Sequence, residues 1–129
     1  SEPAAPAADA ASPSGPSALN ERGFALIQQG SYEEAIPLLQ EAVDSADASS
    51  LTYAYALFNL GNALRLAGRP EEAIPILEER LQIPDQTGVV RRELELAYAA
   101  AGVEGPGGEG GNGQGKAKGK DKKQKDAAD

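Results

Sequence analysis

The chain has 129 residues, no histidine, no cysteine and a formal net charge of −8 at pH 7. Without histidine and cysteine the common proton shuttles, thiol nucleophiles, disulfides and zinc sites are excluded, so we expect no enzyme activity, no metal site and no cofactor. The sequence contains no apolar run near the roughly 20 residues that a membrane helix needs, which predicts a soluble chain that does not insert into a membrane.

The two ends of the chain are poor in large apolar side chains. Residues 1–16, "SEPAAPAADAASPSGP", contain four prolines and six alanines, and such a segment cannot bury enough apolar surface to offset its chain entropy. Residues 105–129 are first glycine-rich and then lysine-rich. We therefore predict a disordered Pro/Ala-rich linker at 1–16, one domain at 17–104, and a disordered tail at 105–129.

Charge is divided unevenly between these parts. Residues 17–104 contain six arginines and fourteen acidic residues, a net charge of −8, whereas residues 105–129 contain six lysines and four acidic residues, a net charge of +2. Phosphate binding requires a positive surface, so the pattern argues against nucleic acid as a partner of the domain. The tail leaves tethering to a polyanion open as an alternative. Its "GGNGQGKA" lacks the Ser or Thr, the preceding strand and the following helix of a phosphate-binding loop.

Five helices are predicted between residues 17 and 104. Their apolar residues recur at the i, i+3, i+4, i+7 spacing of a helix with one buried face. The second helix begins with Ser31 and Glu34, which have the spacing of a capping box. The fourth begins with Pro70, a favoured first helical residue. The predicted helices cover residues 17–29, 31–46, 52–67, 70–81 and 88–101.

The second and fourth helices repeat one another. "GSYEEAIPLL" begins at Gly30 and "GRPEEAIPIL" at Gly68, and seven of these ten positions are identical, a proline inside each helix included. The helices before them each hold a glycine, Gly23 and Gly61, at a cost of about 1 kcal/mol relative to alanine. We interpret these glycines as places where the backbone of another helix comes too close for a Cβ. Glu95 holds the equivalent position in the last helix, which we therefore expect to be a terminal cap.

These residues resemble the tetratricopeptide repeat. The resemblance rests on the paired glycines, on Glu-Glu-Ala after the second glycine, and on the 34 positions from Gly68 to Gly102. Arg80 departs from it, because alanine is usual at that position. The resemblance implies an all-α solenoid of helical hairpins, with two repeats and a C-terminal capping helix, that binds a protein or peptide partner.

In such an array the first helix of each unit lines a concave groove. The residues that the resemblance places there are Asn20, Phe24, Ile27, Gln28, Tyr55, Phe58, Asn59, Asn62, Arg65, Arg92 and Leu96. A groove with an aromatic floor and a rim of Asn and Arg suits an extended or helical peptide. The alternative is that Phe24, Tyr55 and Phe58 only complete a thin core. The carboxylate clamp by which some members hold chaperone C-termini is not reproduced, because only Asn59 matches it.

Two further readings of the sequence remain. The module could self-associate through the exposed face of residues 88–101, which would make it a homo-oligomer. The order of linker, repeats and tail also resembles the C-terminal region of bacterial membrane-anchored serine/threonine kinases. That resemblance implies a fragment of a larger signalling protein with an extracytoplasmic location; without it, a cytoplasmic location is expected.

Overall fold

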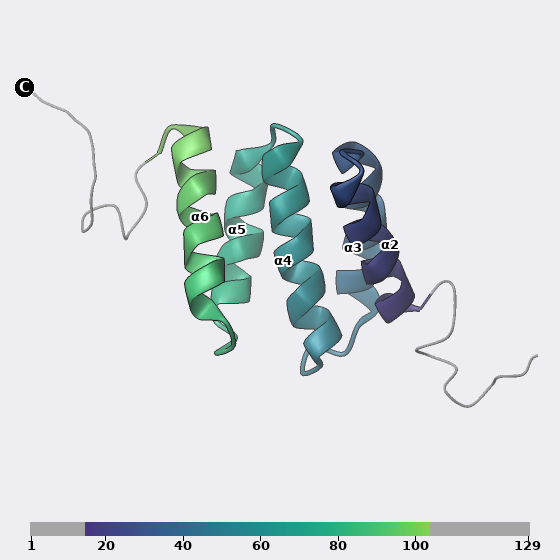
Figure 1. Ribbon diagram of the computed structural model, residues 1–129. Coiled ribbons are helices and arrows are strands. Elements are labelled where there is room, and N and C mark those ends of the chain that lie inside the picture. Colours follow the sequence, from purple (N-terminus) through teal and green to yellow (C-terminus); the bar gives the residue numbers. More distant parts are fainter. Residues whose placement is uncertain (1–14, 104–129) are drawn as a thin grey trace, which may run out of the picture.

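Each of the five predicted helices is present in the computed structural model, which describes residues 15–103 (Figure 1). The helices are α2 (Pro16–Gln28), α3 (Tyr32–Ser45), α4 (Leu51–Leu66), α5 (Pro70–Leu81) and α6 (Thr87–Ala101). Their ends agree with the prediction to within about one residue. The described part of the chain contains no strand, so the all-α fold of five helices is confirmed. The predicted tail, and all of the predicted linker before Gly15, lie outside the described residues.

The helices form two layers. α2, α4 and α6 lie side by side in one layer, and α3 and α5 form the other (Figure 1). Each helix packs against the next one along the chain, and α4 also packs against α2 and α6, so that α4 contacts all four other helices. α3 and α5 share no comparable interface. Within a layer, the main contacts are those of α4 with α2 and α6, and we call the layer that these three helices form the inner layer.

The core lies between the two layers. Leu39, Leu57, Leu60, Leu77 and Val90 are its largest fully buried side chains. Each comes from the apolar stripe of its helix, and each contributes about 1.5–3 kcal/mol by leaving water. Seven other buried positions are alanines, whose small side chains let the helices approach closely. A core of this kind in a domain of this size depends on regular packing between neighbouring helices.

The two glycines inside helices face leucine side chains, so our prediction of backbone-to-backbone contact was wrong. A Cβ added at Gly23 would lie 2.5 Å from Leu39 Cγ, and one added at Gly61 would lie 2.5 Å from Leu77 Cγ. Both leucines are fully buried. Each hairpin therefore packs by inserting a leucine of its second helix into a space that a glycine leaves in its first helix.

Three glycines end helices in the left-handed region of backbone conformation. Gly30, Gly68 and Gly102 have φ values of 84°, 84° and 74°, which a residue with a Cβ adopts only with strain. In each case the residue that follows the glycine donates its backbone N–H to the carbonyl of the residue five positions earlier. This hydrogen bond is the one that defines a Schellman motif. The three bonds are Ser31 to Leu26, Arg69 to Leu64 and Val103 to Tyr98.

The starts of the helices follow the sequence less closely. Pro70 is the first residue of α5, as predicted. Ser31 is the residue before α3, but its side chain makes no capping hydrogen bond, so the predicted capping box with Glu34 is not formed. Ser50 provides the cap that we did not predict, because its Oγ accepts a 3.1 Å hydrogen bond from the amide of Tyr53 at the start of α4.

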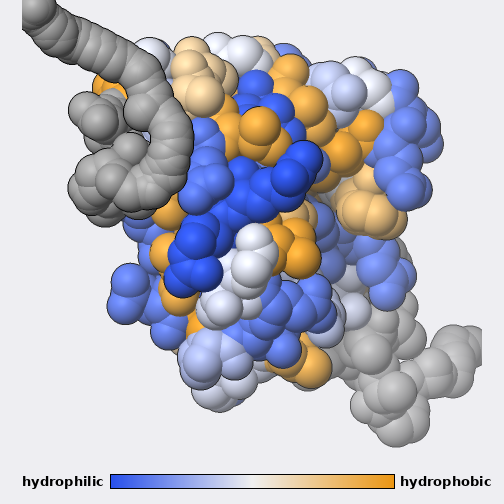
Figure 2. All heavy atoms as spheres, turned by 60° about the vertical axis from the view of Figure 1, so that its left-hand side comes forward, coloured by the Kyte–Doolittle hydropathy of each residue, from blue (hydrophilic) through white to orange (hydrophobic). Residues whose placement is uncertain are grey.

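The last helix, α6, has a charged face on the side that points away from the other helices. Glu95, at the position equivalent to Gly23 and Gly61, is exposed, and so is Arg91 one turn earlier. Figure 2 brings the α6 side of the molecule forward and shows a band of hydrophilic side chains running across it between apolar patches. A charged outward face needs no further helix to cover it, as expected for a terminal cap.

Two tyrosines bond to glutamates of α5. Tyr98 donates a 2.6 Å hydrogen bond to Glu78 Oε2 from α6, and Tyr53 donates to Glu79 from α4. Burial, then the hydrogen bond to Glu78 and its charge, raise the pKa of Tyr98 to about 12. The hydrogen bond to Glu79 is the main cause that raises the pKa of Tyr53. Both shifts favour the protonated phenol in the folded state.

We expect the domain to lose stability above about pH 10. Tyrosine in the unfolded chain ionises near pKa 10, and Tyr98 in the folded chain near 12. Its contribution is therefore complete below pH 10 and is lost as the pH rises from about 10 to 12. Urea unfolding at a series of pH values measures this loss. In Tyr98→Phe the free energy of unfolding should fall less between pH 10 and 12 than in the wild type. The control is Tyr55→Phe, which removes a hydroxyl that bonds to no other helix and should leave this fall unchanged. A fall in Tyr98→Phe as large as in the wild type would contradict the assignment to Tyr98.

Candidate functional site

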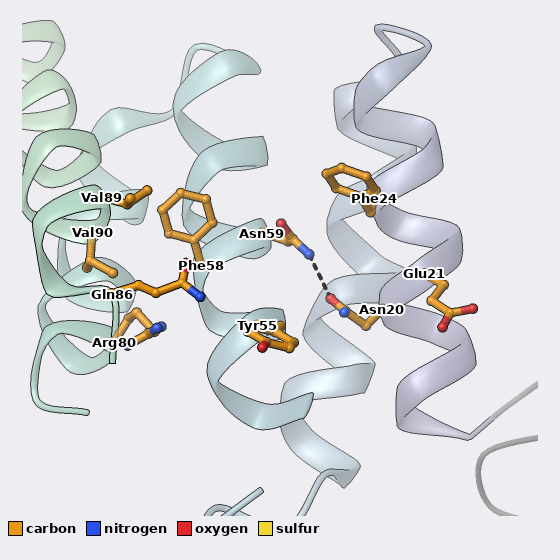
Figure 3. A pocket seen from close by; sticks show the side chains of 10 residues that line it. All are labelled: Asn20, Glu21, Phe24, Tyr55, Phe58, Asn59, Arg80, Gln86, Val89 and Val90. Atoms are coloured by element: carbon orange, nitrogen blue, oxygen red, sulfur yellow. Dashed lines mark hydrogen bonds between the residues drawn. The ribbon is translucent and has the colours of Figure 1, made fainter. Parts of the chain in front are cut away.

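A pocket of about 290 Å³ opens in the inner layer between α2, α4 and α6. Five apolar side chains form most of its wall, and polar side chains lie around them (Figure 3). The residues that line it are Asn20, Glu21, Phe24, Tyr55, Phe58, Asn59, Arg80, Gln86, Val89 and Val90. Of the predicted groove residues, Asn20, Phe24, Tyr55, Phe58 and Asn59 lie in this pocket.

The three aromatic side chains differ in burial. Phe24 is 46% exposed and Tyr55 is 42% exposed. Phe58 is half-buried and packs against the core. Two of the three aromatic residues thus have nearly half of their surface in solvent, and only Phe58 also packs against the core. Exposed rings beside a concave apolar wall are a common setting for ligand binding.

An amide pair spans the pocket between the two repeats. Asn59 Nδ2 on α4 donates a 2.9 Å hydrogen bond to Asn20 Oδ1 on α2 (Figure 3). Asn59 Oδ1 and Asn20 Nδ2 make no hydrogen bond within the described residues. This leaves a free amide oxygen and free amide N–H groups beside the aromatic rings, so the pair can both accept from and donate to an extended peptide backbone.

A second polar cluster lies between α4 and α6, outside the pocket. Glu93 on α6 is buried, and its carboxylate accepts hydrogen bonds from Arg65 and from Asn62, both on α4. The bonds from Arg65 Nη2 and from Asn62 Nδ2 are each 3.2 Å long. Arg65 and Asn62 were predicted as groove residues, and in the structure their side chains are paired with Glu93.

The other four predicted groove residues also lie outside the pocket lining. Ile27 packs against the core, whereas Gln28 on α2 and both Arg92 and Leu96 on α6 are exposed. The structure therefore divides the predicted groove set into a pocket group, a pair bonded to Glu93, one residue that packs against the core, and three exposed residues outside the pocket.

Arg80 is the main site residue that sequence reasoning did not find. It is only 2% exposed and lies near the end of α5. Its Nη1 donates to the carbonyl of Ile83 at 3.1 Å, and its Nη2 to the carbonyl of Asp85 at 2.7 Å. The sequence did contain one sign that Arg80 is special. It is a charged residue within the apolar stripe of its helix, at a position where the repeat pattern has alanine.

A sequence model of the tetratricopeptide repeat matches residues 16–86, which is more than half of the chain. The chain belongs to the tetratricopeptide repeat family. No curated protein and no solved structure matches it significantly. The family match ends at Gln86, the residue before α6, so it covers the two complete hairpins.

Membership of the tetratricopeptide repeat family indicates a general class of function. Tetratricopeptide repeats generally mediate protein–protein interaction and are typically not catalytic. The match lends no support to a parent kinase or to a signalling role. Within residues 15–103 no group of acidic residues has the arrangement of a metal site, and no helix is long and apolar enough to cross a membrane.

Proposed function

We propose that this tetratricopeptide domain binds an extended segment of a partner protein in the pocket between α2, α4 and α6. The observation that carries the proposal is the exposure of Phe24 and Tyr55, at 46% and 42%, on the wall of a concave pocket. Leaving two aromatic rings in water forgoes the free energy of burying them. A partner that covers the rings recovers this free energy on binding.

The pocket supports one apolar anchor and a hydrogen-bonded backbone. Its volume of about 290 Å³ is at the lower end of ligand pockets, so it suits one or two large side chains. Asn20 and Asn59, beside the rings, keep a free donor and a free acceptor for the main chain of the segment. Buried aromatic anchors surrounded by polar groups are the pattern of binding hot spots.

Tyr55→Ala should weaken binding of the partner segment by about tenfold or more with little change in stability, because the ring is a contact of the pocket and not of the core. Peptides selected from a displayed library of random linear peptides serve as probes, and fluorescence anisotropy gives their affinity. The matched control is Leu51→Ala, which removes a side chain that is 60% exposed and lies outside the pocket. Equal effects of the two substitutions would refute the proposal.

Self-association through α6 has less support than peptide binding. The outward face of α6 carries the exposed charges of Arg91 and Glu95, whereas stable homodimer interfaces are enriched in apolar residues. Tethering through the lysine-rich tail concerns residues 116–125, which lie outside the described residues. The pocket is therefore the surface on which we base the function.

A further inference from the structure

We propose that the α6 end of the pocket receives an Asp or Glu side chain of the bound segment, next to the apolar side chain that contacts the aromatic rings. This inference rests on the proposed function, since it names the chemistry of the segment that the same pocket selects. Three features at this end of the pocket carry it: the buried guanidinium of Arg80, the amide of Gln86 and the uncapped start of α6.

Arg80 has a donor without an acceptor. Its side chain is 3% exposed and lines the pocket, and Nε finds no hydrogen-bond partner within the described residues. Buried polar groups are nearly always hydrogen-bonded, because an unpaired buried donor loses its bonds to water without replacement. A carboxylate oxygen is the acceptor that would gain most at a guanidinium, because the resulting bond is charge-assisted.

The start of α6 adds donors at the same end. Gln86 precedes the helix with φ at 53°, and its side chain makes no capping hydrogen bond to the first turn. Instead it extends from α6 toward Phe58 across the pocket (Figure 3). The first amides of the 15-residue α6 have no carbonyl partner within the helix, and the helix dipole places partial positive charge there.

Asp85 does not fill the role that we assign to the ligand. Its Oδ2 forms a 3.6 Å ion pair with Arg80 Nη2, which is longer than a hydrogen bond, and Oδ2 accepts no hydrogen bond within the described residues. Asp85 is not among the residues that line the pocket. Asp85 therefore offsets part of the positive charge of Arg80, but Arg80 Nε still has no hydrogen-bond acceptor within the described residues.

The α2 end of the pocket has an acidic residue, whose carboxylate points away from the other lining side chains (Figure 3). Glu21 on α2 lines the pocket there and is exposed. A segment that places its acidic residue near α6 and a basic residue near α2 would therefore match the pocket in one direction only. Because exposed charges are screened over about 8–10 Å in physiological salt, these local groups outweigh the net negative charge of the domain.

The test uses peptides selected on the wild-type chain from a displayed library of random linear peptides. We expect the selected peptides to carry an acidic residue beside a bulky apolar one. Replacing that acidic residue by its amide counterpart should weaken binding by about tenfold or more. Gln86→Glu, which adds a repelling charge at the α6 end, and Arg80→Gln should weaken binding of the original peptide to a similar degree. The matched control is Gln29→Glu, which makes the same change at an exposed residue outside the pocket.

The outcomes separate this inference from the proposed function. Peptides that bind and depend on Tyr55 but contain no acidic residue, or that tolerate both Gln86→Glu and the amide replacement, would overturn the inference and leave the proposed function standing. Failure to select any peptide that depends on Tyr55 would overturn both. If circular dichroism shows that Arg80→Gln does not fold, two other measurements still test the inference. They are the affinity of Gln86→Glu, a change at an exposed residue, and the affinity of the peptide in which the acidic residue is replaced by its amide counterpart.

Discussion

Gly61→Ala should destabilise the domain by about 1–3 kcal/mol, although alanine is the better helix former by about 1 kcal/mol. The new Cβ would lie 2.5 Å from Cγ and Cδ2 of Leu77, which is fully buried and cannot move aside without disturbing the core. Urea unfolding of the two proteins measures the difference in the free energy of unfolding. A Gly61→Ala protein that is as stable as the wild type would show that the leucine repacks freely.

Two further variants isolate the cause. Gly88→Ala, at a glycine of α6 with no atom near a built Cβ, should be neutral or slightly stabilising, because it gains helix propensity without overlap. Leu77→Ala alone should cost about 2–5 kcal/mol. The double variant of Gly61 and Leu77 should cost less than the sum of the single changes, because the alanine at 61 then enters space that the leucine has left. Strict additivity would contradict direct packing of the two residues.

Glu93→Ala should destabilise the domain by about 3 kcal/mol, because it leaves Arg65 and Asn62 without their shared acceptor. Loss of one partner of a buried ion pair costs about 3–5 kcal/mol, and we expect the lower end because the Arg65 side chain is 22% exposed while that of Glu93 is 8% exposed. The cost should appear as earlier unfolding in urea. The backbone amides of α6 should also exchange their hydrogens faster, because the ion pair between Glu93 and Arg65 holds α6 against α4.

A surface ion pair provides the control for Glu93. Glu72 pairs with Arg69 at 2.8 Å, but both side chains are well exposed, at 57% and 36%. Exposed pairs contribute little because water solvates the separated charges almost as well. Glu72→Ala should therefore leave the unfolding midpoint almost unchanged. A loss as large as that of Glu93→Ala would mean that burial does not set the strength of these pairs.

Most of the fold could be predicted from the sequence because it depends on local periodicity. The apolar stripes, Pro70 and the glycines at 30, 68 and 102 place the helices and their ends within about one residue. The partner of Gly23 and Gly61 could not be predicted. A glycine within a helix indicates that something approaches closely, but it does not show whether that is backbone or a leucine from 16 positions further along the chain.

The candidate site was predicted less completely, because it depends on contacts between helices. The positions of Arg65 and Asn62 along their helix indicate that both side chains face the inner layer. They do not indicate that both side chains donate hydrogen bonds to Glu93, which lies 28 positions after Arg65. Arg80 was recognised as a departure from the repeat, yet its place beside the pocket depends on the turn between α5 and α6. The resemblance to the repeat family placed Tyr55 in the groove, but the sequence left open whether its ring belonged to the groove or to the core, because that depends on the neighbouring helices.

The exposed carboxylate of Glu95 has a consequence for how copies of this chain behave at high concentration. A glycine there would leave an exposed gap of the kind that Leu39 and Leu77 fill inside their own hairpins, whereas the charged side chain of Glu95 stays in water. We therefore expect the charge of Glu95 to oppose stacking of another copy against this face of α6.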